Sequence, residues 1–190
     1  DIFLERFKNM QVSLLAVDEA HCISQWGYDF RPSYLEIATI RELQPNVPIL
    51  ALTASATPEA QVDIMEKLAF RKPYQRFFKS FKRDNISFVV RKTDNKEKKL
   101  LDVLKKVPGT AIVYTRSRKR SQELASFLNT HGFSALFYHA GLKHEVRNEL
   151  QDAWIQNKNR IMVSTNAFGM GIDKPDVRLV VHMDLPENLE

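Results

Sequence analysis

The stretch Ser13-Leu14-Leu15-Ala16-Val17-Asp18-Glu19-Ala20-His21 joins a short apolar run directly to two carboxylates and a histidine. Such a run, bounded by polar residues, is typical of a strand that is buried in a parallel sheet. A carboxylate at the end of a buried strand is costly unless it meets a cation. In nucleotide hydrolases this cation is the magnesium ion on the β- and γ-phosphates. The stretch therefore predicts parallel strands with a nucleotide site at a strand end.

Three residues of this stretch receive specific roles. We predict that Asp18 holds Mg²⁺ through water and that Glu19 orients or deprotonates the attacking water. His21 can report the state of the two acids to neighbouring groups. The alternative is that the acids only cap the next helix, as acidic residues after a strand often do.

The same alternation of apolar runs and helical periods continues along the chain. Strands are predicted at 13–17, 48–52, 110–114, 134–138, 160–164 and 178–182, near-continuously apolar as in strands buried on both faces. Helices are predicted at 35–43, 58–69, 95–107, 118–131 and 142–156, with Thr57 as N-cap of the second and Gly132 ending the fourth. This order predicts a doubly wound α/β architecture in which ligands gather at the carboxyl ends of the strands.

Length and composition narrow the class of protein. The 190 residues, 44% of them hydrophobic, can form one large domain or two modest ones. The polar stretch 79–85 interrupts the alternation, so we predict domains at 1–79 and 80–190. No run of about 18 apolar residues and no signal peptide occur, which favours a soluble protein without a membrane partner. The single cysteine, Cys22, excludes a cysteine-based zinc site and fits a reducing compartment, the bacterial cytoplasm or a eukaryotic nucleus.

Positive charge is concentrated in one part of the chain. The net charge is +5, yet residues 71–120 hold 17 Lys and Arg against 4 Asp and Glu. A single run such as Lys96-Glu97-Lys98-Lys99 can be only a solvated face. The excess over the whole block predicts a phosphate backbone as partner, because neutralising that backbone releases counterions.

The stretch Gln25-Trp26-Gly27-Tyr28-Asp29-Phe30-Arg31 places three aromatic rings at alternate positions among polar residues. It is too polar for a core strand and too aromatic for an ordinary loop. Aromatic faces stack on unpaired bases, which stabilises by about 1 to 3 kcal/mol each, and Arg31 can add phosphate contacts. We predict that Gln25, Trp26, Tyr28, Phe30 and Arg31 bind nucleic acid. The alternative is a hydrophobic plug between layers.

Two more polar segments follow predicted strands. The small hydroxyl residues of Leu52-Thr53-Ala54-Ser55-Ala56-Thr57 suit a hinge-like loop that bonds an acid or a phosphate, and Thr57 also caps a helix. The segment Tyr114-Thr115-Arg116-Ser117-Arg118-Lys119-Arg120 lies where a strand turns into a helix. Amides at that helix start would reinforce the basic side chains in holding a backbone phosphate.

Two loops in the last third of the chain complete the pattern. Tyr138-His139-Ala140-Gly141 follows a strand, and we predict a loop contact rather than a metal site, because no cysteine or carboxylate stands at ligand spacing to its histidines. In the glycine-containing loop 164–175, Lys174 occupies the place of the third glycine of a dinucleotide fingerprint, so that interpretation fails. Asp173 in this loop is then interpreted as a polar residue at an interface position.

Taken in order, these segments resemble the helicase core of the RecQ family of DNA helicases, in helicase superfamily 2. The likeness spans nearly the whole chain. The stretch with Asp18 and Glu19 resembles motif II, residues 25–34 resemble the family's aromatic-rich loop, and residues 52–57 resemble motif III. The later segments resemble motif IV, the tyrosine-histidine-alanine-glycine loop and motif V, at 114–118, 138–141 and 164–178.

The resemblance implies two RecA-like lobes of the P-loop nucleoside triphosphate hydrolase fold, with parallel sheets flanked by helices. It implies ATP and Mg²⁺ as cofactors, 3′-5′ translocation on single-stranded DNA, unwinding of partly duplex DNA, and a role in DNA repair and recombination. The resemblance implies that a set of residues in the first lobe couples DNA binding to hydrolysis: His21, Gln25, Trp26, Arg31, Thr53, Ser55 and Thr57. Contacts with the DNA backbone fall to Ser117, Arg118, His139 and Thr165, and Asp173 would face the nucleotide.

The chain departs from the family pattern in several places. Lys82-Arg83-Asp84-Asn85 stands where the family usually has Asp-Arg-Pro-Asn, and Arg116 stands where asparagine is common. No G-x-x-x-x-G-K-[ST] phosphate loop is present, and the family's arginine finger lies beyond Glu190. We therefore expect an internal fragment, with both lobes incomplete, that does not hydrolyse ATP by itself.

Two other interpretations stay open. A DEAH-type RNA helicase shares the four residues Asp18-Glu19-Ala20-His21 but should lack the tryptophan-centred loop. A non-enzymatic nucleic-acid-binding module could keep the helicase scaffold after losing ATP chemistry.

Overall fold

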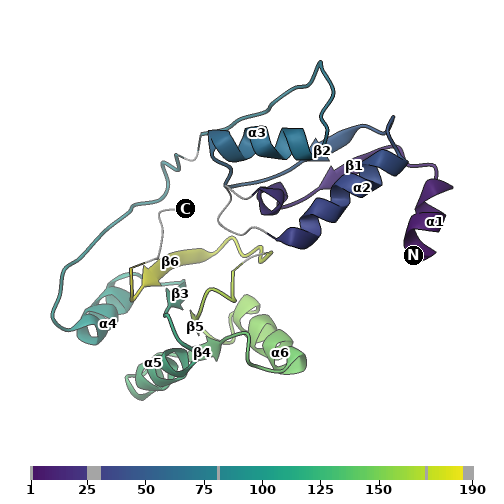
Figure 1. Cartoon of the computed structure of the whole chain (residues 1–190). Coiled ribbons are helices and arrows are strands. Elements are labelled where there is room, and N and C mark those ends of the chain that lie inside the picture. The colour runs from purple at the N-terminus through teal and green to yellow at the C-terminus, as the bar shows by residue number, and fades with distance from the viewer. Residues whose placement is uncertain (1, 25–30, 81, 170, 186–190) are drawn as a thin grey trace. The chain divides into compact units, whose positions relative to one another are not determined.

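The computed structural model describes the whole chain except residues 1, 25–30, 81, 170 and 186–190 (Figure 1). The chain divides into two compact units, residues 1–84 and 85–189. The sequence places the division between residues 79 and 80. Among the described residues, no helix is long and apolar enough to cross a membrane.

The first unit, residues 1–84, is built on two short parallel strands, β1 (Leu15–Val17) and β2 (Ile49–Ala51), with Val17 opposite Ala51. Its helices are α1 (Ile2–Lys8), α2 (Glu36–Leu43) and α3 (Pro58–Lys67), together with the 3-10 turns η1 (Ala20–Ile23) and η2 (Pro32–Leu35). The α3 helix begins where the sequence predicts, because the Thr57 hydroxyl accepts a hydrogen bond from the Ala60 amide at 3.2 Å.

One face of this two-stranded sheet forms the core of the first unit. Val17 packs with Ile23 of η1 and with Ile64 and Leu68 at the end of α3. The opposite face is open, since Leu50 is 40% exposed. The prediction of strands buried on both faces is therefore wrong for β1 and β2, because the described helices pack on one side only.

The second unit, residues 85–189, has four parallel strands in the order β4-β5-β3-β6. Their bounds are β3 (Thr110–Tyr114), β4 (Ala135–Tyr138), β5 (Ile161–Ser164) and β6 (Val177–His182), and the helices are α4 (Lys96–Lys106), α5 (Arg118–Thr130) and α6 (His144–Ile155). Because all four strands are parallel, Tyr114, Tyr138, Ser164 and His182 end them at one edge of the sheet. The predicted α/β class, with helices flanking parallel sheets, is confirmed.

The helices of the second unit cover both faces of its sheet, as can be followed in Figure 1. Leu104 of α4 and Leu124 of α5 pack on the face formed by Val113 and Val163. Trp154 of α6 packs on the other face. The central strands β3 and β5 are buried, as predicted, whereas β6 alternates between half-buried and exposed residues. As an edge strand it lies at the limit of the helix layers, so the prediction of burial on both faces is wrong for β6.

Leu124 makes this packing testable, because its side chain is fully buried. The Leu124→Ala variant should lose about 2 to 5 kcal/mol of unfolding free energy, since it removes buried methyl groups and leaves a cavity between α5 and the sheet. Urea denaturation measures the loss. The control Ser126→Ala, at an exposed position of the same helix, should change stability by less than about 0.5 kcal/mol; equal losses would contradict the packing described.

Candidate functional site

The end of β1 carries the two acids in a sharp turn. Asp18 is exposed, and one of its carboxylate oxygens accepts a hydrogen bond from the Glu19 amide at 2.8 Å. Glu19 has a φ of 49°, a left-handed conformation that residues other than glycine rarely adopt. The following amide, that of Ala20, donates to the Leu52 carbonyl at 2.9 Å. The acids are thus presented by a strained turn that is tied to the end of β2.

A buried histidine joins this turn to the loop after β2. The His21 ring is 3% exposed, and its Nδ1 lies 3.0 Å from the Thr53 hydroxyl and 3.3 Å from a carboxylate oxygen of Glu19. The Thr53 hydroxyl also accepts a hydrogen bond from the Ser55 amide at 3.3 Å. A conformational change in either loop can therefore be transmitted to the other loop through the His21 imidazole ring. Coupling between the two loops requires such a shared contact.

The aromatic-rich stretch is described only at its two ends. The Arg31 amide donates to the Cys22 carbonyl at 2.8 Å, which closes the loop between them, and the Arg31 residue is exposed. Gln25, Trp26, Tyr28 and Phe30 lie outside the described residues. Their predicted contacts with nucleic acid stay predictions.

In the second unit, the start of α5 forms a small polar surface after β3. The Ser117 hydroxyl caps the helix by accepting a hydrogen bond from the Arg120 amide at 3.1 Å. The Thr115 side chain is buried and bonds the Ser117 carbonyl at 3.4 Å. Ser117 and Arg118 are both exposed. The cap thus fixes the start of α5, and with it the position from which the Arg118 side chain extends.

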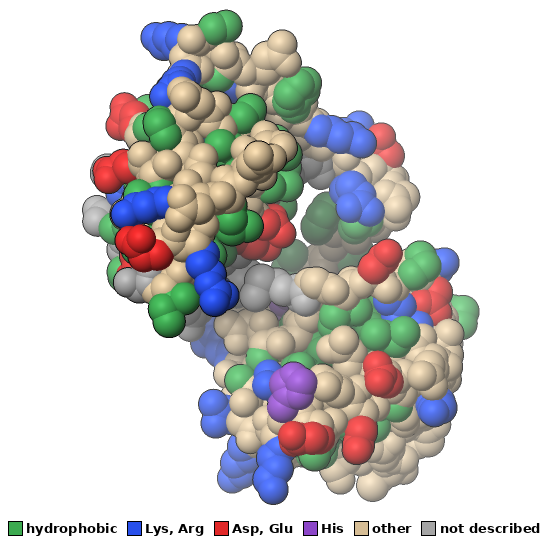
Figure 2. Space-filling model, turned by 90° about the vertical axis from the view of Figure 1, so that its right-hand side faces the viewer, with side chains coloured by type: hydrophobic (Ala, Val, Ile, Leu, Met, Phe, Trp, Pro, Cys, Tyr) green, Lys and Arg blue, Asp and Glu red, His purple; other side chains and the backbone are tan. Residues whose placement is uncertain are grey.

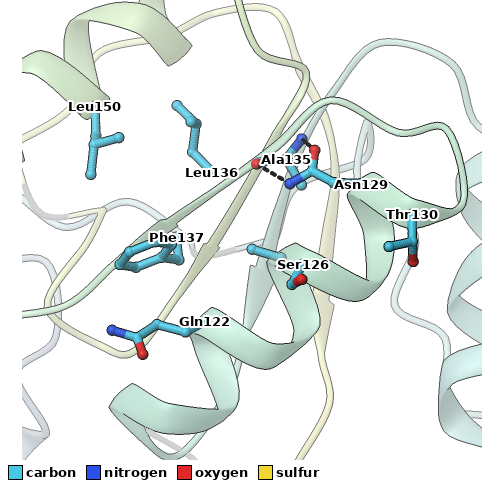
Figure 3. Close-up of a pocket in the computed structure, with 9 residues that line it drawn as sticks. Gln122, Ser126, Asn129, Thr130, Ala135, Leu136, Phe137 and Leu150 are labelled. Atoms are coloured by element: carbon cyan, nitrogen blue, oxygen red, sulfur yellow. Dashed lines mark hydrogen bonds between the residues drawn. The ribbon is translucent and has the colours of Figure 1, made fainter.

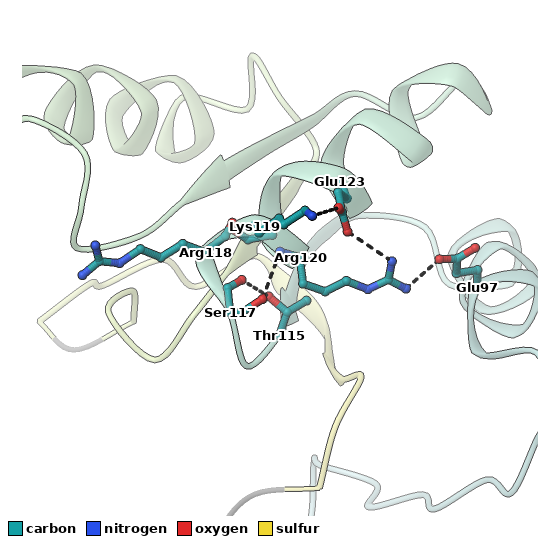
Figure 4. Close-up of polar contacts among 8 residues, drawn as sticks. Glu97, Thr115, Ser117, Arg118, Lys119, Arg120 and Glu123 are labelled. Atoms are coloured by element: carbon teal, nitrogen blue, oxygen red, sulfur yellow. Dashed lines mark hydrogen bonds and ion pairs between the residues drawn. The ribbon is translucent and has the colours of Figure 1, made fainter.

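The basic run at this helix start is partly neutralised, as Figure 4 shows. Arg120 pairs with Glu97 of α4 at 2.6 Å, and Lys119 lies 3.8 Å from Glu123. Arg118 extends away from these carboxylates. On the molecular face in Figure 2, Lys and Arg side chains are likewise interspersed with Asp and Glu. At this helix start, Arg120 and Lys119 thus lie beside carboxylates, whereas the exposed Arg118 points away from them.

Arg118 reaches the loop after β4. A Cβ atom placed on Gly141 would lie only 2.8 Å from Arg118 Nη1, so a side chain there would displace the guanidinium. His139 of the same loop is buried, with its Nε2 at 3.1 Å from Gln122 Nε2 and its ring stacked on Phe137. Its Nδ1 has no hydrogen-bond partner among the described residues. The structure places His139 inside the loop, and its direct contact with DNA stays a prediction.

The loop after β5 approaches the end of β3 closely. The Tyr114 hydroxyl donates to the Phe168 carbonyl at 2.9 Å, and burial raises the pKa of the Tyr114 phenol. Gly169 has a φ of +123°, and a Cβ atom there would lie 2.6 Å from that hydroxyl oxygen. Thr165 is buried, and its amide donates to the Tyr138 carbonyl at 3.3 Å. The loops that follow β3, β4 and β5 are thus linked at one edge of the sheet.

A shallow cavity of about 530 Å³ lies on the α5 and β4 side of the second unit (Figure 3). Gln122, Ser126 and Asn129 of α5 line it, together with Phe137 of β4. The Asn129 amide bonds both the carbonyl and the amide of Ala135, at 2.9 and 3.0 Å. These bonds occupy the outer edge of β4 and so protect it against pairing with another strand. None of the predicted site residues lines this cavity.

Comparison with known proteins identifies the family. The model described as "Helicase conserved C-terminal domain" matches residues 95–190, and the model described as "DEAD/DEAH box helicase" matches residues 1–64. The chain belongs to the helicase family. Both core segments of superfamily 2 helicases are therefore represented, as the motif order predicts.

Individual relatives support the same assignment. The chain is 41% identical to the "RecQ-like DNA helicase blm-1" of Caenorhabditis elegans, over 100% of this chain and 20% of the relative. It is 43% identical to the "Putative ATP-dependent RNA helicase R290" of Acanthamoeba polyphaga mimivirus, over 98% of this chain and 34% of the relative. The resemblance to RecQ-family helicases is confirmed, and the chain spans about a third or less of these relatives.

A solved structure supports the fold. Dbp5 of Saccharomyces cerevisiae, described as "S. cerevisiae Dbp5 L327V bound to RNA and ADP BeF3", aligns with a TM-score of 0.72 at 20% identity. The alignment covers 99% of this chain and 49% of that chain. At this level of identity the likeness shows a shared helicase fold.

Some residues of this helicase site carry no obvious sequence signal. Gln122 holds His139 and lies four positions after Arg118, on the same side of α5, so helical spacing could have pointed to it. Tyr114 and Gly169 make their contact across 55 positions of sequence, which spacing does not reveal. Within the described residues, no three His, Cys, Asp or Glu side chains converge on a metal position. The predicted Mg²⁺ role of Asp18 needs only its own carboxylate, through water.

The His21 contact predicts a local loss of stability. The Thr53→Val variant keeps the side-chain volume but removes the oxygen that faces the buried His21 Nδ1, so we expect the unfolding free energy to fall by about 1 kcal/mol. Urea denaturation measures this change. Thr39→Val, at an exposed position of α2, is the matched control; an equal effect in both variants would show that the His21 contact contributes nothing.

The Tyr114–Gly169 approach predicts a substitution that a second one repairs. Gly169→Ala should be more destabilising than Gly171→Ala, because both glycines have positive φ but only Gly169 would bring a Cβ against another atom within 4 Å. We expect a difference of about 1 to 3 kcal/mol in thermal or urea unfolding. Adding Tyr114→Phe to Gly169→Ala should recover part of it. Equal costs at the two glycines would contradict the contact.

Proposed function

We propose that the whole protein is an ATP-dependent DNA helicase of the RecQ type. It couples ATP hydrolysis to 3′-5′ movement along single-stranded DNA and to the unwinding of partly duplex DNA, in DNA repair and recombination. The observation that carries this proposal is the contact of His21 with both Glu19 and Thr53, because it joins the acidic turn to the loop that resembles motif III. The 41% identity to a RecQ-like DNA helicase supports the DNA substrate.

The acidic turn supplies the hydrolytic part of this function. Asp18 would hold Mg²⁺, and its exposed carboxylate at a strand end fits that ion, which prefers oxygen ligands and retains several waters. When bound, Mg²⁺ neutralises charge on the β- and γ-phosphates of ATP. Glu19 orients the attacking water. His21, which contacts both Glu19 and Thr53, transmits a change at Glu19 to Thr53. Ser55, whose amide bonds Thr53, and Thr57, which caps α3, complete the coupling loop.

Nucleic-acid contacts are assigned to both units. In the first, Arg31 lies next to the predicted base-stacking residues Trp26, Tyr28 and Phe30, with Gln25 in the coupling role. In the second, Ser117 and Arg118 are exposed at the start of α5 and suit a backbone phosphate. His139 and Thr165 are buried in the loops after β4 and β5, and their contacts with the DNA backbone are part of the proposal.

The two core segments have separate assignments. Residues 1–79 form part of the ATP-binding lobe and residues 80–190 part of the second lobe. The protein acts on chromosomal DNA, in the nucleoid region of a bacterial cytoplasm or in a nucleus.

An RNA helicase is the second candidate, because the mimivirus relative at 43% identity is named a putative RNA helicase. The aromatic-rich stretch 25–34 and the RecQ-like relative favour DNA. The two candidates differ in the nucleic acid that they unwind, and not in the chemistry of Asp18 and Glu19.

A side-by-side unwinding assay on the whole protein separates them. The substrates are DNA and RNA duplexes of one sequence, each with either a 3′ or a 5′ single-stranded tail, with ATP and Mg²⁺ present. We expect unwinding of the 3′-tailed DNA duplex to exceed that of the RNA duplex by at least about tenfold, with loss of activity in Glu19→Gln. Preferential unwinding of RNA would support the second candidate, and DNA binding without ATP-dependent unwinding would point to a non-catalytic module.

A further inference from the structure

Lys174, in the loop between β5 and β6, is a buried cation with a full set of acceptors. Its side chain is 4% exposed. The ammonium donates to the Ile155 carbonyl at the end of α6 at 3.0 Å, to Asn157 Oδ1 at 2.8 Å, and pairs with Asp176 Oδ1 at 2.7 Å. It also lies 5.2 Å from the centroid of the Trp154 ring. A lysine is buried at this cost only where such partners replace its water.

The partners of Lys174 are themselves fixed to the sheet. The Thr110 hydroxyl, at the start of β3, lies 3.3 Å from Asp176 Oδ2 and 3.1 Å from Asn157 Oδ1. The hydrogen bond from Lys174 holds the pKa of the Asp176 carboxyl below its ordinary value. Asn157 takes a left-handed backbone conformation with a φ of 59°, and its side chain belongs to this cluster. Lys174 therefore fastens its loop both to α6 and to the first residue of β3.

This anchor acts directly beside Asp173. On the other side of Asp173, Ile172 packs against the apolar cluster that contains Trp154 and Phe168. Asp173 itself is exposed. Ile172 is thus held by apolar packing and Lys174 by hydrogen bonds and an ion pair, while Asp173 between them is exposed on a short piece of backbone.

We propose that Lys174 is a positioning residue that sets the place of the Asp173 carboxylate for nucleotide binding. This inference rests on the proposed function and on the expectation, implied by the family resemblance, that Asp173 faces the nucleotide. An exposed carboxylate on a free loop would lose rotational and translational freedom on each binding event, whereas an anchored one has largely lost it already. Lys174 acts through the backbone of its loop and touches no substrate.

The expected energetic pattern separates positioning from mere stabilisation. If Lys174 works through Asp173, the Lys174→Met variant should weaken nucleotide binding only while Asp173 is present. If Lys174 only stabilises the second unit, its effect on binding should be absent or should add fully to that of Asp173→Ala.

The experiment is a double-mutant cycle in the whole protein, with Lys174→Met, Asp173→Ala and the combined variant. The readouts are the Kd for a fluorescent ATP analogue and the KM and kcat of ATP hydrolysis. We expect each single variant to raise Kd and KM by about tenfold, and the combined variant to be no weaker than Asp173→Ala alone. The control is Lys158→Met, which removes an exposed lysine near the same turn and should leave both values unchanged.

Amide hydrogen exchange gives a readout that needs no nucleotide. In Lys174→Met, exchange at residues 171–176 should rise by about tenfold relative to the rest of the second unit. If Lys174→Met does not fold, Asp176→Asn replaces it, because it weakens the same anchor and keeps the shape of the side chain.

The outcomes distinguish this inference from the proposed function. Unchanged exchange at residues 171–176, or an effect on Kd that adds fully to that of Asp173→Ala, overturns the positioning role. An Asp173→Ala variant that binds ATP normally overturns it as well. A wild-type protein that neither binds nor hydrolyses ATP refutes the proposed function instead, while the exchange measurement still decides whether Lys174 anchors the loop.

Discussion

The parallel pairing of the strands is the constraint on which the rest of this helicase chain depends. Parallel hydrogen bonding brings the carboxyl ends of neighbouring strands to one edge, so Tyr114, Tyr138 and Ser164 end side by side in the second unit. In the first unit, the pairing of Val17 with Ala51 does the same for the loops that carry Asp18 and Thr53. Residues far apart in the sequence can therefore contact one another without any special feature of the loops themselves.

The buried side chains at these strand ends hold the loops in place, and the exposed side chains of the same loops are available to bind ligands. Three of the predicted site residues are buried and hydrogen-bonded, namely His21, His139 and Thr165. Two others, Asp18 and Arg118, are exposed. Buried polar groups are usually hydrogen-bonded, and Thr53, Gln122 and Tyr138 supply such partners from other segments to His21, His139 and Thr165 respectively.

Much of the architecture could be predicted from the sequence, because apolar runs and helix caps act locally. The bounds of β3 match the prediction, and Thr57 and Ser117 start their helices where hydroxyl residues precede a helical period. The α1 helix was not predicted, since seven residues give too short a period. Long-range pairing was also out of reach. Arg120 meets Glu97 across 23 positions, and two acceptors of Lys174, Ile155 and Asn157, lie at or just after the end of α6. Charge counts along the chain cannot show which cations are already paired.

The central claim is that the acidic turn and its buried histidine belong to an ATPase that responds to DNA. Its most direct test compares ATP hydrolysis by the whole protein with and without single-stranded DNA, in the wild type and in His21→Ala. The account predicts that DNA stimulates the wild type and that the ratio of stimulated to unstimulated rates falls toward one in the variant. An unchanged ratio in His21→Ala would contradict the account.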